Sequence, residues 1–183
     1  ISFAPDGRLS YHQTTADTGV DAWTVPVDFS DEQNPRAGTP ELFLRTPFGD
    51  QTPVFSADGR WIAYQSNESG VNELFVRPFP GPGERWQVSS EGSSGSSPMW
   101  SRTAPEIFYV GRDNRIMVAT YTVRDGAFRS STPRVWSNTP VVDTGGGGSV
   151  ALHPDGKRFA IVPTPKTAGA SDSMHVTLIL NLV

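Results

Sequence analysis

The sequence predicts an all-β fold built from four propeller blades, each a four-stranded antiparallel sheet, with the last blade incomplete. Two observations predict it. Four segments of the chain align with one another at a period of about 50 residues, which is typical of propeller blades. In addition, 18 glycines and 16 prolines punctuate the 183 residues, and the longest segments without either are 14 residues long (112–125 and 170–183), too short for the helices of a bundle.

Each aligned segment begins with an apolar residue and passes through a turn into an apolar strand, which predicts a hairpin. The segments begin at Phe3, Phe55, Trp100 and Leu152, and these residues are 52, 45 and 52 positions apart. Asp-Gly forms the turn in three copies, because glycine tolerates positive φ and aspartate bonds its own backbone. The third copy has Arg102-Thr103-Ala104 instead, which predicts a looser turn.

Four short strands per repeat place the blades at approximately 1–50, 51–95, 96–147 and 148–183, so that the repeat covers residues 1–183. After the hairpins, the first two blades are predicted to continue with strands at 22–27 and 41–45, and at 72–79 and 85–89. A polar loop at 30–40 separates the first pair, and Pro80-Gly81-Pro82-Gly83 forms a turn between the second pair.

The last two blades follow the same scheme. The third is predicted to have strands at 114–123 and 133–137, with a turn at Asp125-Gly126. The fourth is predicted to have strands at 158–162 and 175–182, separated by a loop rich in proline, glycine and serine. Neither end of the chain supplies a strand to complete the last blade. We therefore expect part of a larger propeller, or a half-ring that self-associates through its open strand edges.

Composition excludes several classes of protein. The chain has no cysteine, which rules out disulfides, cysteine-ligated metals and thiol nucleophiles. No apolar run approaches the ~18 residues of a membrane helix, so no membrane segment is expected in this chain. The formal net charge is −4 and no basic cluster is present, which argues against a nucleic-acid partner. Trp61, Trp86 and Trp100 fall within apolar strand patterns and are expected to fill the core between blades.

The sequence predicts no catalytic residue. The nearest approach to a serine-hydrolase elbow is Gly147-Gly148-Ser149-Val150-Ala151, but the repeat places Ser149 at the start of an inner strand with no helix after it. The glycines at 145–148 lack the lysine of a phosphate-binding loop and are interpreted as a connector. No cofactor is expected.

No metal site is predicted either. His12, His153 and His175 fall in different parts of different blades, without the clustering that metal ligands need. The aspartates of the three Asp-Gly turns recur at equivalent positions, and a ring of carboxylates on one face could hold a cation. The favoured interpretation is that each aspartate closes its own hairpin.

One polar cluster is a candidate ligand-binding site. It lies at the turn between the second and third strands of the second blade and contains Asn67, Glu68, Asn72 and Glu73. His153, which occupies the serine place of the repeat, is added to this candidate set. The alternative, a solvated turn with no ligand, is the favoured interpretation of the cluster.

The aligned hairpins resemble the TolB-like propeller repeat, a bacterial relative of the WD repeat, whose hallmark is an aromatic residue followed by Ser-Pro-Asp-Gly and an apolar strand. The copies at Phe3, Phe55 and Leu152 match this pattern, and the copy at Trp100 matches only partly. Segments 44–48, 66–70, 72–83, 86–89 and 176–182 are similar to the propellers that follow the kinase domain and membrane helix of bacterial receptor-type Ser/Thr kinases.

This resemblance implies a non-catalytic recognition or scaffold module of a longer signalling protein such as a Ser/Thr kinase. Its partner would be a protein, a peptide or a small molecule at the propeller face. The module would be extracytoplasmic, in the periplasm or on the surface of a bacterium, with a cytoplasmic location left open. The alternative is the propeller part of a serine peptidase whose catalytic domain is absent from this chain.

Overall fold

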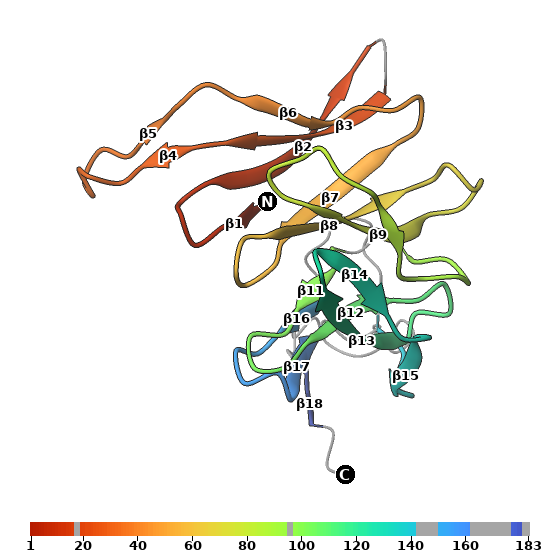
Figure 1. The fold of residues 1–183 in the computed structure, drawn as a ribbon. Helices are drawn as coiled ribbons and strands as arrows, with labels where there is room; N and C mark the ends of the chain where they lie inside the picture. Colours follow the sequence, from red (N-terminus) through yellow and green to blue (C-terminus); the bar gives the residue numbers. More distant parts are fainter. Residues whose placement is uncertain (17–18, 95–96, 142–149, 162–176, 181–183) are drawn as a thin grey trace, which may run out of the picture.

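The computed structural model describes residues 1–16, 19–94, 97–141, 150–161 and 177–180. The secondary structure in these ranges consists of β-strands alone. The main sheets are antiparallel and follow one another along the chain (Figure 1). The predicted all-β, propeller-like fold is therefore confirmed.

The first two sheets have the predicted four strands. The first has the order β1 (Ser2–Phe3), β2 (Leu9–Thr15), β3 (Gly19–Val25), β6 (Glu41–Leu44). The second has the order β7 (Asp50–Phe55), β8 (Trp61–Ser66), β9 (Glu73–Pro78), β10 (Trp86–Gln87). The predicted polar loop of the first blade holds a small hairpin that the sequence did not indicate, with strands β4 (Val27–Asp28) and β5 (Arg36–Ala37).

The third sheet has five strands rather than the predicted four. They are β11 (Met99–Trp100), β12 (Glu106–Val110), β13 (Ile116–Arg124), β14 (Ala127–Ser130) and β15 (Arg134–Ser137). One half of β13 pairs with β12 and β15, and the other half extends beyond them to pair with β14. In the described part of the fourth sheet, β16 (Val150–Leu152), β17 (Arg158–Ile161) and β18 (Thr177–Leu180) are paired in that order.

The additional strand β14 follows from the turn chemistry at Asp125-Gly126. Both residues have positive φ, 51° and 76°, as a two-residue hairpin turn requires. The returning strand brings Phe128 into full burial, where its ring lies 5.4 Å from that of Trp61 and 5.0 Å from that of Tyr121. The hairpin of β13 and β14 therefore covers the junction between the second and third sheets.

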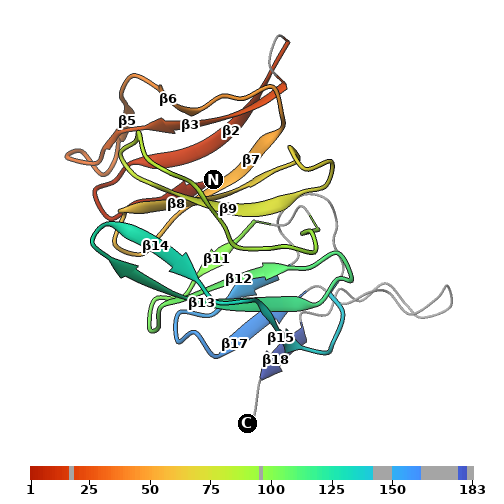
Figure 2. The same ribbon diagram turned by 45° about the vertical axis from the view of Figure 1, so that its right-hand side comes forward.

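The core lies between successive sheets, which pack face to face (Figures 1 and 2). The second and third sheets share the largest cluster, in which Trp61 and Trp100 are buried and Trp86 packs against them. This confirms the prediction that the three tryptophans fill the core between blades. Phe108 and Phe159 pack between the third and fourth sheets, with ring centroids 5.2 Å apart.

The sheets have two distinct edges. The turn edge carries the Asp-Gly turns, where Gly59 lies beside Pro5 and Gly156 beside Thr103. The loop edge carries the turns β2–β3, β8–β9 and β12–β13 together with the segments 45–49 and 88–94, which lead to the next sheet. In Figure 1 the turn edge is on the left and the loop edge on the right.

Candidate functional site

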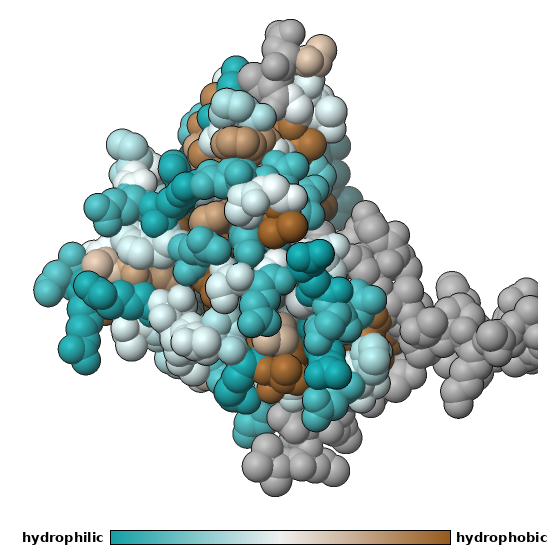
Figure 3. All heavy atoms as spheres, turned by 90° about the vertical axis from the view of Figure 1, so that its right-hand side faces the viewer, coloured by the Kyte–Doolittle hydropathy of each residue, from teal (hydrophilic) through white to brown (hydrophobic). Residues whose placement is uncertain are grey.

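A hollow of about 760 Å³ lies on the loop edge, at the junction of the first two sheets. It is lined by Gly19, Arg45, Thr46, Pro47, Phe48, Gly49 and Asn67. Figure 3 views the molecule from this edge, and most of the described surface that it shows is hydrophilic, with separate hydrophobic spots. The hollow is the candidate functional site because it combines a cation, an exposed aromatic ring and a positioned amide.

Asn67 fixes one wall of the hollow. It follows β8 directly, and its Oδ1 accepts a hydrogen bond from the backbone N–H of Gly49 at 2.9 Å. Its backbone carbonyl accepts from the N–H of Gly70 at 2.9 Å and closes the β8–β9 turn, in which Gly70 has a φ of 88°. A glycine is required there because this left-handed conformation is costly for other residues. Asn67 thus ties the connection from the first sheet to the turn of the second.

Arg45 brings a cation to the lining of the hollow. It follows β6, and its Nε donates to Oδ2 of the fully buried Asp21 at 3.0 Å. Its guanidinium carbon lies 5.8 Å from the centroid of the Trp23 ring, within the range of a cation–π contact. These contacts fix the guanidinium, and Phe48 exposes 40% of its surface nearby on the rim of the hollow. A fixed cation beside an exposed ring suits an anionic group next to an apolar one.

A second buried carboxylate anchors the loop that carries Phe48. Asp50 is almost fully buried, and its Oδ2 accepts from Oγ1 of Thr46 at 2.7 Å. The same Oγ1 accepts from the N–H of Phe48 at 3.1 Å. Burial raises the pKa of Asp50, because the charged form loses hydration that the hydroxyl of Thr46 only partly replaces.

The other three residues predicted with Asn67 lie on the same edge, but each bonds to protein groups near it and does not line the hollow. Oε1 of the buried Glu73 accepts from the N–H of Gly92 at 3.0 Å, and its Oε2 accepts from the hydroxyl of Ser89. Glu68 forms a two-pronged ion pair with Arg85, which holds the pKa of Glu68 below its usual value. The backbone carbonyl of Asn72 accepts from the N–H of Ser93 at 2.7 Å. Of the four, Asn67 is the one that lines the hollow.

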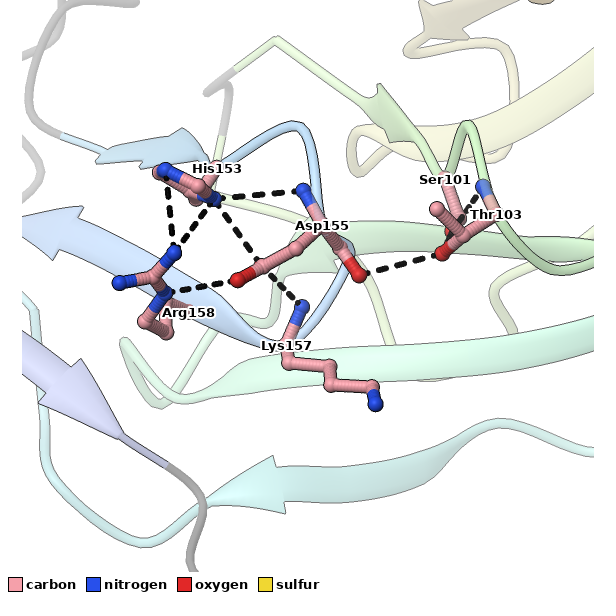
Figure 4. Close-up of polar contacts among 6 residues, drawn as sticks. All are labelled: Ser101, Thr103, His153, Asp155, Lys157 and Arg158. Carbon is pink, nitrogen blue, oxygen red and sulfur yellow. Dashed lines mark hydrogen bonds and ion pairs between the residues drawn. The ribbon is translucent and has the colours of Figure 1, made fainter.

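His153 lies on the turn edge, in the turn between β16 and β17, beside Asp155 and Arg158 (Figure 4). Its Nδ1 accepts from the N–H of Asp155 at 3.2 Å, and the guanidinium of Arg158 lies 3.2 Å from both ring nitrogens. Oδ1 of Asp155 accepts from the N–H of Lys157 at 2.9 Å, and this bond, together with Arg158, lowers the pKa of Asp155 to about 2. The candidate ligand-binding residues that were named from the sequence therefore lie on two different edges of the molecule.

The turn aspartates each bond their own turn, as the favoured interpretation predicted. Oδ1 of Asp6 accepts from the N–H of Arg8 at 3.0 Å, and Oδ1 of Asp58 accepts from the N–H of Arg60 at 3.1 Å. The third copy has no aspartate, and Ser101, two positions earlier, takes over its role. The Oγ of Ser101 accepts from the N–H of Thr103 at 3.3 Å and from the next N–H at 3.2 Å. Across the described ranges, no three histidine or acidic side chains gather as a metal ion would need.

Some predicted residues are placed elsewhere or are outside the described ranges. His12 lies in the first sheet, where its Nδ1 accepts from the N–H of Thr52 at 3.3 Å. Ser149, the glycines at 145–148 and His175 lie outside the described residues.

Sequence reasoning did not assign Arg45 or Phe48 to a site. Segment 44–48, which contains both residues, was used only for the resemblance to the propellers of receptor-type Ser/Thr kinases. An aromatic residue directly after proline, in a connection between blades, was the signal that could have drawn attention to the hollow.

Comparison with known proteins supports the fold. No protein-family model matches the chain, and no curated protein matches it. The crystal structure of TolB from Acinetobacter baumannii is similar to 98% of this chain, with a TM-score of 0.52 and 14% sequence identity. This chain covers 42% of that TolB chain, so it spans less than half of its length. In the described part of the chain, no helix is long and apolar enough to cross a membrane. The similarity shows that the chain shares the β-propeller architecture of TolB.

Proposed function

We propose that this chain is a non-catalytic recognition module that binds a segment of a protein or peptide at the hollow on the loop edge. The observation that carries the proposal is that the fixed guanidinium of Arg45 and the exposed ring of Phe48 line the same hollow. The hollow is open and shallow, which suits a peptide segment better than an enclosed small molecule. The preferred ligand carries a carboxylate next to an apolar side chain.

The module belongs to a longer signalling protein, as its extracytoplasmic sensor or scaffold in the periplasm or on the surface of a bacterium. The similarity of segments 66–70 and 72–83 to the propellers of receptor-type Ser/Thr kinases supports this context. The alternative context is a serine peptidase whose catalytic domain is absent from this chain. In both contexts the chain itself recognises and does not catalyse.

A peptide library displayed on phage tests the binding proposal. Peptides selected on the 183-residue chain are expected to carry an acidic residue beside an apolar one. Their affinity, measured by calorimetry, is expected to fall at least ~10-fold with Phe48→Ser, because the ring supplies the apolar contact. Phe29→Ser is the matched control, since Phe29 is an equally exposed ring on the turn edge.

Arg45→Gln is a second variant for the affinity measurement. Because Arg45 also pairs with Asp21, circular dichroism is needed to verify that this variant folds. Selection of peptides that bind both phenylalanine variants equally would contradict the assigned site. Hydrolysis of a peptide or ester substrate by the purified chain, abolished by Ser149→Ala, would contradict the non-catalytic assignment.

A further inference from the structure

A second hollow, of about 380 Å³, lies on the loop edge at the junction of the second and third sheets. The same two parts of the fold form it as form the first hollow: the connection from the preceding sheet, here 90–92, and the turn after the second strand of the next sheet, here 111–115. The two parts are tied together where the N–H of Ser94 donates to the carbonyl of Val110 at 2.9 Å. Each of the two sheets packs against a further sheet on its other face, so this junction is internal to the fold.

An apolar row lines the second hollow. Tyr109, Met117 and Val135 are cross-strand partners on β12, β13 and β15, and all three line the hollow. Tyr109 exposes 3% of its surface, Met117 is half-buried and Val135 exposes 38%. Burial raises the pKa of the Tyr109 phenol, which therefore stays uncharged. The row runs from the core between the sheets out to the surface.

The equivalent row of the second sheet is covered. Because segment 55–64 aligns with segment 100–109, this row consists of the cross-strand partners Tyr64, Phe75 and Gln87. Phe75 exposes 4% of its surface, and the guanidinium carbon of Arg85 lies 4.9 Å from its ring centroid. The outer position of the row is the polar Gln87 here and the apolar Val135 in the third sheet. The third sheet thus presents an apolar contact at a place where the second sheet presents none.

The charges around the second hollow cancel. Its lining includes two acidic side chains, Glu91 and Asp113, and two basic ones, Arg112 and Arg115. Nε of Arg115 pairs with Oδ2 of Asp113 at 3.4 Å. The side chain of Arg112 crosses Gly92, where any Cβ would collide with it. With no net charge, the hollow does not select a charged group, and its apolar row suits an apolar side chain.

One turn joins the two hollows. Asn67, at the start of the β8–β9 turn, lines the first hollow, and the carbonyl of Asn72, at its end, accepts from the N–H of Ser93 beside segment 90–92. The charge of Glu68 within this turn is compensated by Arg85. Sheets that pack face to face lie ~10 Å apart, and an extended peptide advances ~3.3 Å per residue. A peptide laid across the turn therefore reaches from one hollow to the other in about three or four residues.

We propose that the second hollow binds an apolar side chain of the same peptide segment that occupies the first hollow, about three or four residues from its acidic–apolar pair. This rests on the proposed function and adds a second anchor to it. The row of Tyr109, Met117 and Val135 supplies the apolar contact. Two anchors on one segment raise its affinity because the second contact forms within the complex that the first has made.

Fluorescence anisotropy with synthetic peptides tests this arrangement. Each peptide carries an Asp-Leu pair, extended at either end by a glycine–serine spacer of variable length and then by a phenylalanine or, for comparison, an alanine. The phenylalanine is expected to raise the affinity at least ~10-fold at the best spacing, because its ring leaves water. Val135→Asp is expected to abolish this gain and to leave the alanine peptides unaffected. Leu42→Asp is the matched control, since Leu42 is a similarly exposed aliphatic residue and lines neither hollow.

Phe48→Ser separates the second hollow from the first. It is expected to weaken the phenylalanine and alanine peptides alike, because both use the first hollow. If Phe48→Ser weakens them but the phenylalanine adds no affinity at any spacing, or its gain survives Val135→Asp, the second anchor is overturned and the proposed function stands. If Phe48→Ser leaves every peptide unaffected, the proposed function fails and the second anchor fails with it. Circular dichroism verifies folding, and Val135→Thr, which keeps the shape of the side chain, replaces Val135→Asp if that variant unfolds.

Discussion

The two edges of the blades are held together in different ways. On the turn edge, each aspartate accepts a hydrogen bond from the N–H two residues after it, as in Asp58 and Asp155. On the loop edge, Asn67 bonds Gly49 across 18 positions and Glu73 bonds Gly92 across 19. Local bonds of one kind close the three Asp-Gly turns. The loop edge instead depends on side chains that link one blade to the connection beside it.

The electrostatics of the two edges also differ. At the turn edge, Asp155 is half-buried and stabilised by hydrogen bonds, so its pKa falls to about 2. At the loop edge, Asp50 is buried and burial raises its pKa. The turn edge therefore repeats one structural element, the aspartate-bonded turn, whereas the loop edge has a distinct set of side chains at each junction. This difference between junctions is why we propose the loop edge as the recognition surface.

The largest expected effect comes from breaking a buried link of the loop edge. Glu73→Ala leaves the hydroxyl of Ser89 and the N–H of Gly92 without their acceptor, and we expect a loss of about 3 kcal/mol in the free energy of unfolding. Urea denaturation measures the loss. Glu84→Ala is the matched control, since Glu84 is exposed, and is expected to change stability by less than about 0.5 kcal/mol. Equal stability of the two variants would show that Glu73 does not hold the loop.

The next largest effect is expected at the turn edge, on the stability of the fold. Gly59 has a φ of 70°, and a Cβ there would lie 3.1 Å from Cδ of Pro5. Gly59→Ala is therefore expected to cost about 1–2 kcal/mol in thermal or urea unfolding. Gly70→Ala on the loop edge separates backbone strain from contact, because Gly70 has a φ of 88° and no atom within 4 Å of its Cβ position. A larger loss at Gly70 than at Gly59 would contradict a packed turn edge.

The smallest effect concerns the charge of Asp50. Because its pKa is raised in the folded state, the ionised carboxylate destabilises the fold at neutral pH and stability is regained as pH falls through that pKa. Asp50→Asn keeps an oxygen for the hydroxyl of Thr46 and removes the charge. We expect it to raise the free energy of unfolding by roughly 1 kcal/mol at pH 7.

The pH dependence provides the control for Asp50→Asn. The difference between variant and wild type is expected to shrink as pH falls through the raised pKa of Asp50, because the carboxylate then becomes protonated. Asp155→Asn has the opposite sign, because the pKa of Asp155 is lowered and its contribution is lost only as pH falls through about 2. An Asp50→Asn variant that is less stable than wild type at pH 7 would show that the carboxylate is well paired.

The elements that the sequence predicted correctly share a local cause. The hairpins at Phe3, Phe55 and Leu152 depend on turn chemistry within a few residues, and the structure pairs their strands as predicted. The turn after Trp100 lacks the Asp-Gly pair and was predicted to be looser; in the structure the hydroxyl of Ser101 accepts from two N–H groups of this turn. The strand β14 was missed although its turn was recognised, since a tight Asp-Gly turn demands a returning strand on its far side.

The candidate site was predicted only in part. Asn67 was found from its polar neighbours, but Arg45 and Phe48 were not, because their role depends on the first sheet meeting the turn of the second. His153 was added to the same candidate set from its place in the repeat, and the fold puts it in the β16–β17 turn, whereas Asn67 lines the hollow. Side chains of different repeats come together only through the stacking of sheets, which no local pattern encodes.

The sequence by itself determined the repeat, the hairpin turns and the burial of the tryptophans, because glycine conformation, aspartate bonding and apolar strands act over short distances. Only the tertiary structure decided which carboxylates became buried and which edge became hollow. The physical reason is that these properties depend on the neighbour of each sheet. Phe55 and Trp100 occupy one position of the repeat, yet Phe55 packs against Ala4 of the first sheet whereas Trp100 packs among residues of the second.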